Sequence, residues 1–413
     1  MMKNDGTVAM KGLGSLLLAG ALAFGAAVPA AWAKKPKKSP PKSAGISAEM
    51  EATLLRSLDD IFRMDFDAAD RDTKKVVELN PEHPHGYLAV SVVTLMRFLY
   101  DTEQTDQELI KPFTEQVKTT VAVAKKWLDK NPRDPEALMA MGAAYGVLSR
   151  LECTRKEWLD AYFHGRDAIK FVRKAAKADP ELYDAHLGIG MYDYYTDVYS
   201  HVVKILTKFL FGGNRLRGIE HLKLAAEKGR YSRLAAKLIL VEIYTEDKFG
   251  SRDTAEAVRI MADLRKTYPD SPMLHSACII SLYEHGDYKK VVSESRAYLE
   301  RVAAGRYRGL DKAKGHVMLA TGLWALGEKS QALEHFKEAS LVQFNDRLSR
   351  WAVWGLIRSG QLMDELGMRK EALTSYSRAS HEPDHWKLKS IAQAGSRRPY
   401  ARGEPGPIPP LAD

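Results

Sequence analysis

The stretch Leu319–Ala339, LATGLWALGEKSQALEHFKEA, decides the fold class. Apolar residues recur every three or four positions in both of its halves, and this spacing gives an α-helix one apolar face. Gly327 stands between the halves, where it can supply the turn that ends the first helix. Ala320 and Ala332 are small, as two closely crossing helices require. The stretch therefore predicts a helical hairpin, which needs stacked neighbours to bury its apolar face.

The same pattern can be followed along the chain from residue 48 to residue 383. Its best first helix outside the opening stretch contains Leu138, Met141 and Tyr145. Eight hairpins account for this part of the sequence, and those within residues 85–229 are longer than the standard repeat. We therefore predict an all-α solenoid of helical hairpins that is thickened where the hairpins are extended.

These hairpins resemble the tetratricopeptide-repeat family over residues 48–383, on the W-x2-L-G-x2-Y and A-x3-F pattern. The resemblance implies a right-handed α-solenoid whose first helices line a concave groove that binds peptides or partner proteins. A progression from Gly188 through Gly213 and Arg215 to Gly218 also resembles the tetratricopeptide-repeat-39 and Iml-type proteins. No function follows from that second resemblance.

Residues 1–33 have the features of a secretory signal peptide. Two lysines precede an apolar run, and small residues flank the cleavage position after Ala33. The run is short for a transmembrane anchor, and no cysteine stands near the cleavage position, so we expect a periplasmic or secreted protein rather than a lipoprotein. Residues 34–47 contain five lysines and three prolines. This segment predicts a disordered linker, which acts either as a solvated spacer or as a basic tether to an anionic surface.

The C-terminal residues 384–413 are expected to be mostly disordered, because five prolines follow residue 396 and no apolar period is present. The whole chain has a formal net charge of +9, with 45% hydrophobic residues. This balance favours acidic protein partners or an anionic membrane surface. Because no basic run is interleaved with aromatic residues inside the repeats, a nucleic-acid partner is not expected.

If the first helices line a groove, aromatic and charged residues on them are the candidates for binding a partner. These candidates are Tyr192, Asp193, Tyr283, Trp324 and Trp354. The alternative for each aromatic residue is that it fills the space between adjacent hairpins, which is what aromatic residues at helical spacing usually do.

Asp193, Asp197 and His201 are four residues apart, so they form one polar stripe on a helix. Such a stripe could hold a divalent cation, but it is equally consistent with a solvated face of paired side chains. No metal, other cofactor or catalytic set is therefore expected, and an enzyme with a site in residues 192–213 is the minor alternative.

The amphipathic segment 198–211 offers another alternative, a peripheral membrane adaptor with Lys204 and Lys208 at the lipid headgroups. The main expectation is an exported, non-catalytic scaffold that binds protein or peptide partners of the cell envelope through its groove.

Overall fold

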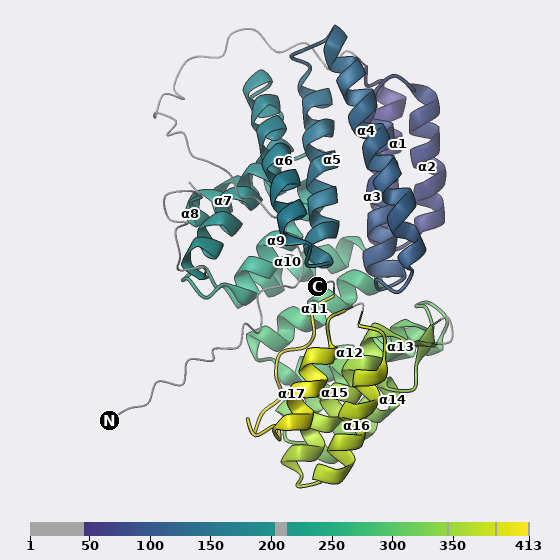
Figure 1. Ribbon diagram of the computed structural model, residues 1–413, viewed down its shortest axis with the longest axis vertical. Helices are drawn as coiled ribbons and strands as arrows, with labels where there is room; N and C mark the ends of the chain where they lie inside the picture. The colour runs from purple at the N-terminus through teal and green to yellow at the C-terminus, as the bar shows by residue number, and fades with distance from the viewer. Residues whose placement is uncertain (1–44, 203–212, 345–346, 385, 412–413) are drawn as a thin grey trace.

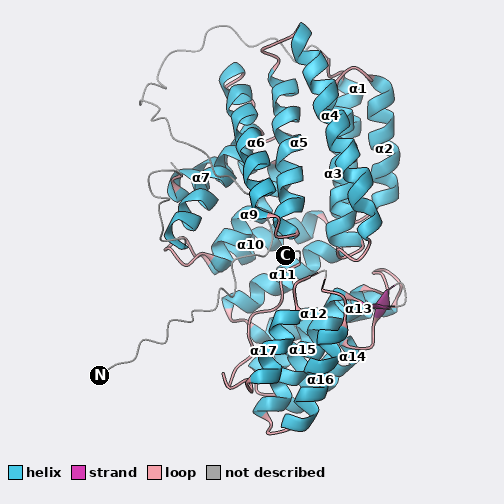
Figure 2. Cartoon of the chain, in the orientation of Figure 1, coloured by secondary structure: helices cyan, strands magenta, loops and turns pink. Residues whose placement is uncertain are grey.

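The computed structural model of the protein describes residues 45–202, 213–344, 347–384 and 386–411 (Figure 1). Seventeen α-helices occur in these residues, and consecutive helices pack against each other along the whole series. Figure 2 shows how little strand there is: β1 (Gln343–Phe344) pairs antiparallel with β2 (Arg347–Leu348) between two hairpins. The predicted all-α solenoid of tetratricopeptide-like hairpins is confirmed.

Eight hairpins contain the first sixteen helices. In order they are α1 (Ala48–Arg63) with α2 (Phe66–Leu79), α3 (Pro84–Met96) with α4 (Ile110–Lys130), α5 (Pro135–Thr154) with α6 (Trp158–Ala178), α7 (Ala185–Val202) with α8 (Arg215–Lys228), α9 (Arg233–Glu246) with α10 (Thr254–Thr267), α11 (Pro272–His285) with α12 (Tyr288–Ala303), α13 (Asp311–Ala325) with α14 (Lys329–Ala339), and α15 (Arg350–Glu365) with α16 (Arg369–His381).

Local sequence signals explain where these helices begin and end. Asp134 and Ser271 each cap a helix that starts with proline, and their side chains accept a backbone N–H of the first turn. Gly286, Gly327 and Gly367 end the first helices of the last three hairpins with φ of +86°, +87° and +76°. Residues other than glycine rarely adopt this backbone conformation, so the three glycines determine the turns of the last three hairpins.

The extra length of the second hairpin lies in its connection. Between α3 and α4 the chain forms a π-helical turn, η1 (Arg97–Asp101), and a 3₁₀ turn, η2 (Gln107–Leu109). Glu103 and Gln104, between these turns, have positive φ and are buried. The connection is therefore an ordered part of the packing.

The solenoid curves until its N-terminal hairpins meet the sixth and seventh. Helix α1 contacts α11, and the Tyr268 hydroxyl donates to Asp59 at 2.5 Å. Arg308 pairs with Asp101, and the Lys314 ammonium lies 3.1 Å from a Glu103 carboxylate oxygen. The connection of the second hairpin is thus joined to the start of α13 by buried charges.

The prediction of a disordered tail over residues 384–413 is wrong for residues 386–411. Helix α17 (Lys389–Arg397) follows the last hairpin, and the Trp386 indole donates to the Glu103 carbonyl at 2.9 Å. Farther on, Ile408 and Leu411 are only 3% and 4% exposed. Prolines exclude a helix there, but an extended strand of chain can still bury apolar side chains against an existing surface.

The linker expected over residues 34–47 is ordered at its end. The Gly45 carbonyl accepts a hydrogen bond from the Asn80 side chain at 2.8 Å, and Ser47 caps α1. The signal peptide, its cleavage after Ala33 and the basic stretch before residue 45 lie outside the described residues, so they remain predictions.

Candidate peptide-binding groove

The first helices of the last three hairpins lie side by side, because α11 contacts α13 and α13 contacts α15. Residues 400–411, called the tail here, run across these three helices and end at Arg350, the first residue of α15 (Figure 1). An extended segment of the chain therefore occupies the surface that the repeat pattern assigns to a ligand.

Polar side chains of the groove bind the tail through its backbone carbonyls. The Tyr283 hydroxyl donates to the Gly406 carbonyl at 3.2 Å, and the Arg358 guanidinium donates to the Pro407 carbonyl. Nη1 of Arg350 donates to the Pro410 and Leu411 carbonyls at 2.9 and 2.8 Å. These contacts recognise an extended backbone and depend little on the side chains of the tail.

Aromatic and apolar contacts complete the binding of the tail. The Tyr400 ring meets the Trp324 ring edge-on, with centroids 5.9 Å apart. Ile408 and Leu411 of the tail are buried, and the Arg358 guanidinium, which donates to the tail, lies over the Trp354 ring at 5.6 Å. Buried aromatic and arginine side chains of this kind usually carry most of the binding energy of an interface.

The two arginines of the groove are buried. Arg350 is 0% exposed and Arg358 is 5% exposed, and burial lowers the pKa of the Arg358 guanidinium. Among the described residues Arg358 has no carboxylate partner, and it donates to the Gln361 side chain at 3.0 Å and to the tail carbonyl. Since a buried charge is costly without acceptors, the carbonyl oxygens of the tail offset the burial that the tail itself imposes on these arginines.

The start of the tail is fixed by residues of the last hairpin. Arg369 donates to the Gly395 and Ser396 carbonyls at 2.9 and 2.7 Å, and the Tyr400 N–H donates to Asp364 at 2.9 Å. The end of α17 therefore places the tail at the entrance of the groove.

The structure divides the five predicted binding residues into two groups. Tyr283, Trp324 and Trp354 lie at the tail-filled groove. Tyr192 and Asp193 lie in the fourth hairpin, far along the chain from it, and are 3% and 1% exposed. For this second group the alternative of internal packing describes what the structure shows.

The polar stripe of the fourth hairpin is occupied by arginines. Asp193 forms a two-bond ion pair with Arg217 of α8, at 2.5 and 2.9 Å, and the Arg173 guanidinium lies 4.8 Å above the Tyr192 ring. Asp197 accepts a hydrogen bond from the Arg215 backbone N–H at 2.9 Å.

The hypotheses for residues 192–213 concern a segment that is only partly described. The His201 side chain and residues 203–212 lie outside the described part, so the structure leaves the membrane-contact and enzyme-site alternatives untested. In the described residues no group of three or more His, Cys, Asp or Glu side chains is placed to hold a metal ion. None of the described helices is both long enough and apolar enough to cross a bilayer.

Sequence reasoning missed the two groove arginines. Arg350, Trp354 and Arg358 are four residues apart, so they share one face of α15. The arginine–tryptophan–arginine spacing on one helix face could have indicated the groove from the sequence. Ile408 and Leu411, two large apolar residues among prolines, could likewise have indicated that the tail packs against the protein.

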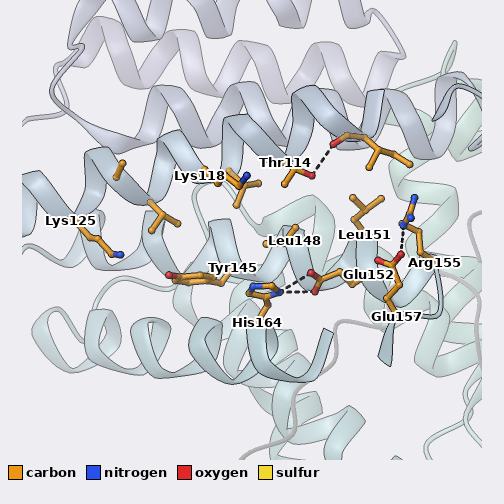
Figure 3. Close-up of a pocket in the computed structure, with 14 residues that line it drawn as sticks. Thr114, Lys118, Lys125, Tyr145, Leu148, Leu151, Glu152, Arg155, Glu157 and His164 are labelled. Carbon is orange, nitrogen blue, oxygen red and sulfur yellow. Dashed lines mark hydrogen bonds and ion pairs between the residues drawn. The ribbon is translucent and has the colours of Figure 1, made fainter. Parts of the chain in front are cut away.

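A separate pocket of about 570 Å³ lies between α4, α5 and α6 (Figure 3). Its walls include Val121, Leu148 and Leu151, and lysines stand at its α4 side. At its base the His164 ring is 2.8 Å from a Glu152 carboxylate oxygen, and burial raises the pKa of Glu152. The arrangement is a histidine–carboxylate contact beside an apolar wall.

Comparison with known proteins gives only distant matches. No known family model matches the chain, and no curated protein matches it. A solved tetratricopeptide repeat protein from Parabacteroides merdae ATCC 43184 is 14% identical, with 73% of this chain and 95% of that chain covered and a TM-score of 0.33. Yeast Tom70 is 12% identical, with 85% and 88% covered and a TM-score of 0.38.

NprR in complex with its cognate peptide NprX is also 12% identical, with 85% of each chain covered and a TM-score of 0.41. Since all these TM-scores are below 0.5, the repeat architecture of this chain rests on its own helix pairs.

Proposed function

We propose that the protein is an exported, non-catalytic scaffold that binds extended peptide segments of partner proteins in the groove along α11, α13 and α15. The observation that carries this proposal is the tail itself, an extended segment held there by three side chains that donate to its carbonyls. A surface that binds one extended segment through its backbone has the chemistry to bind others of similar shape.

The groove combines the features of an efficient peptide site. Trp324, Trp354 and Arg358 are rigid or buried anchors, and the glycine turns of the last three hairpins hold their helices in register. The donors point at carbonyl oxygens, which every peptide has. Affinity therefore comes from the backbone, and selectivity comes from the side chains that fill the apolar cluster.

The place of action is inferred from the first 47 residues. A signal peptide ending at Ala33 would deliver the mature chain to the periplasm or outside the cell, where its partners would be proteins of the cell envelope. N-terminal sequencing of protein recovered from the periplasmic fraction should give Lys34 as the first residue. Recovery from the cytosol with Met1 or Met2 at the start would contradict the export proposal.

The binding function can be tested with a library of displayed 15-residue peptides. Selection should be carried out on the full chain and on a full chain carrying Ile408→Asp and Leu411→Asp, which is designed to release the tail. Selected peptides should lose at least tenfold in affinity when Arg358→Ala is added. Arg378→Ala, at an exposed arginine on α16, is the matched control and should leave affinity unchanged.

Two outcomes of the selection would contradict the binding proposal. One is that no peptide is enriched on either chain. The other is that the enriched peptides bind equally well to the Arg358→Ala variant, which would place them outside this groove.

A further inference from the structure

We propose that the tail is a built-in competitor for the groove, and that the partner segment it imitates is an extended, proline-rich peptide with two apolar anchor residues. This inference rests on the proposed function, because it names the ligand class and the regulation of the same site. The competitor must leave before a partner can bind, so the free chain is held in a closed form.

The chemistry of the tail matches the donors of the groove. Residues 405–411 read PGPIPPL, so four of these seven residues lack a backbone N–H. The groove side chains that contact this stretch are donors, Tyr283, Arg350 and Arg358, and each binds a carbonyl. Proline-rich chain is already extended and presents its carbonyls outward, so it loses little conformational entropy on binding.

The position of Gly406 adds a size restriction. A Cβ on this residue would lie 2.7 Å from the Arg358 guanidinium, which is itself bonded to the next carbonyl of the tail. A larger residue would require the flexible end of the Arg358 side chain to shift, so glycine fits most easily directly before the proline whose carbonyl Arg358 binds.

Two groups of the groove are left unsatisfied by the tail. The Trp354 indole nitrogen and the Nε atom of Arg358 are buried without a hydrogen-bond partner in the described residues. Arg358 likewise has only neutral acceptors there, while Glu404 of the tail is exposed. A partner segment that places an acidic or amide side chain near Arg358 would satisfy these groups better than the tail does.

Because the tail is tethered to the groove, it can occupy the groove even if its intrinsic affinity is modest. A segment joined to its site by a short connection has an effective concentration of about 1 mM, so it occupies the site even when its affinity as a free peptide is modest. The connection is short here, because α17 and the Arg369 contacts end only a few residues before Tyr400.

The test uses a synthetic peptide with the sequence of residues 399–413, PYARGEPGPIPPLAD, labelled at its N-terminus. Fluorescence anisotropy should show it binding to the full chain that carries Ile408→Asp and Leu411→Asp. The unchanged chain should bind it at least tenfold more weakly, since its own tail competes. Adding Arg358→Ala to the released chain should remove binding, whereas adding Arg378→Ala should not.

The outcomes separate the two proposals. Equal binding of the peptide by the released and unchanged chains would contradict the proposal that the tail competes for the groove. Absence of peptide binding to a released chain that keeps its helical circular dichroism would contradict the proposal that the tail is a ligand of the groove. In either case the proposed function stands if displayed peptides still bind in an Arg358-dependent way, and it fails as well if they do not.

Discussion

The fourth hairpin and the last three hairpins present the same kinds of residue on their first helices but use them differently. In the fourth, Asp193 on α7 is bound by Arg217 from the second helix of the same hairpin. In the last three, Tyr283, Trp324 and Arg358 contact the tail, which begins 35 residues after the end of α15. Tyr283 and Trp324 also pack against Tyr288 and Phe336 of their own second helices, and they contact the tail as well.

Both regions contain a pair of facing histidines. His186 of α7 faces His221 of α8 with their Nδ1 atoms 2.6 Å apart, and His316 of α13 faces His335 of α14 at 3.1 Å. Each pair joins the two helices of one hairpin. The hairpins are thus built alike, and the difference between the regions lies in what covers the first helix.

The largest expected effect concerns the support of the groove. Lys314→Met removes the ammonium that lies between the buried Glu103 and Asp311 carboxylates, at 3.1 and 2.9 Å. Leaving buried carboxylates without this partner should lower the free energy of unfolding by about 3–5 kcal/mol, measured by urea denaturation. Lys312→Met, at an exposed position two residues before Lys314, is the matched control and should change it by less than about 0.5 kcal/mol.

A change in the free energy of unfolding of less than about 0.5 kcal/mol for Lys314→Met would contradict this account. The contact between the second hairpin and α13 would then contribute little to the stability of the groove.

The next effect separates the two regions. Arg217→Ala leaves the buried Asp193 carboxylate with Arg173 at 3.8 Å as its remaining cationic neighbour. We expect a loss of about 2 kcal/mol in the free energy of unfolding, because a buried acceptor loses its two bonds. Anisotropy titration with the tail peptide, using the released chain, should show unchanged affinity. A tenfold loss of affinity would mean that the fourth hairpin belongs to the binding site after all.

The histidine pairs predict the same pH response in both regions. Burial and the facing histidine lower the pKa of His186 and of His316 to about 4. Between pH 4 and 6.5 the unfolded chain therefore binds more protons than the folded chain, so stability falls as the pH is lowered through this window. With solvent screening of these half-buried rings, the loss should be roughly 1 kcal/mol per pair.

Urea denaturation at pH 7, 5.5 and 4 measures this loss. Replacing His186 and His316 together by asparagine should reduce the pH dependence, to which the buried His83, with its pKa lowered to about 3, also contributes. Replacing the exposed His381 should leave it unchanged. A pH dependence that is unchanged by the double replacement would show that the pairs are not its source.

The smallest effect sharpens the account of how the tail is held. Tyr283→Phe removes the single hydroxyl that donates to the Gly406 carbonyl at 3.2 Å. A neutral hydrogen bond contributes about 1 kcal/mol, so the tail peptide should bind the released chain roughly fivefold more weakly. Tyr288→Phe is the matched control on the neighbouring helix. Equal affinities for both variants would remove Tyr283 from the site.

The fold could be predicted from the sequence because the signals that define a helical hairpin are local. The apolar period, the capping residues and glycines such as Gly286 and Gly327 act within one or two helical turns, so the eight hairpins were found where they stand. The small helix α17 and the packed tail were missed. Their order depends on the Trp386 and Ile408 contacts with distant parts of the chain, which no local pattern contains.

The candidate site was recovered only in part for the same reason. Tyr283, Trp324 and Trp354 could be named as candidates because an aromatic residue on a first helix is visible in the sequence, and their role in binding stays a prediction. Asp193 looked equivalent, but Arg217 pairs with it from a separate helix. Whether a first-helix residue is available to a ligand depends on such partners, and only the tertiary structure shows them.

The most direct test follows the Ile408 methyl group of the full chain by NMR with isotope-labelled isoleucine methyls, assigned with an Ile408→Val variant. We expect its signal to lie away from the position of a solvent-exposed isoleucine, since the side chain is 3% exposed in the groove. An excess of a proline-rich peptide selected for groove binding should move the signal to the exposed position. A signal that stays where it is while that peptide binds would contradict the assignment of the tail-filled groove as the binding site.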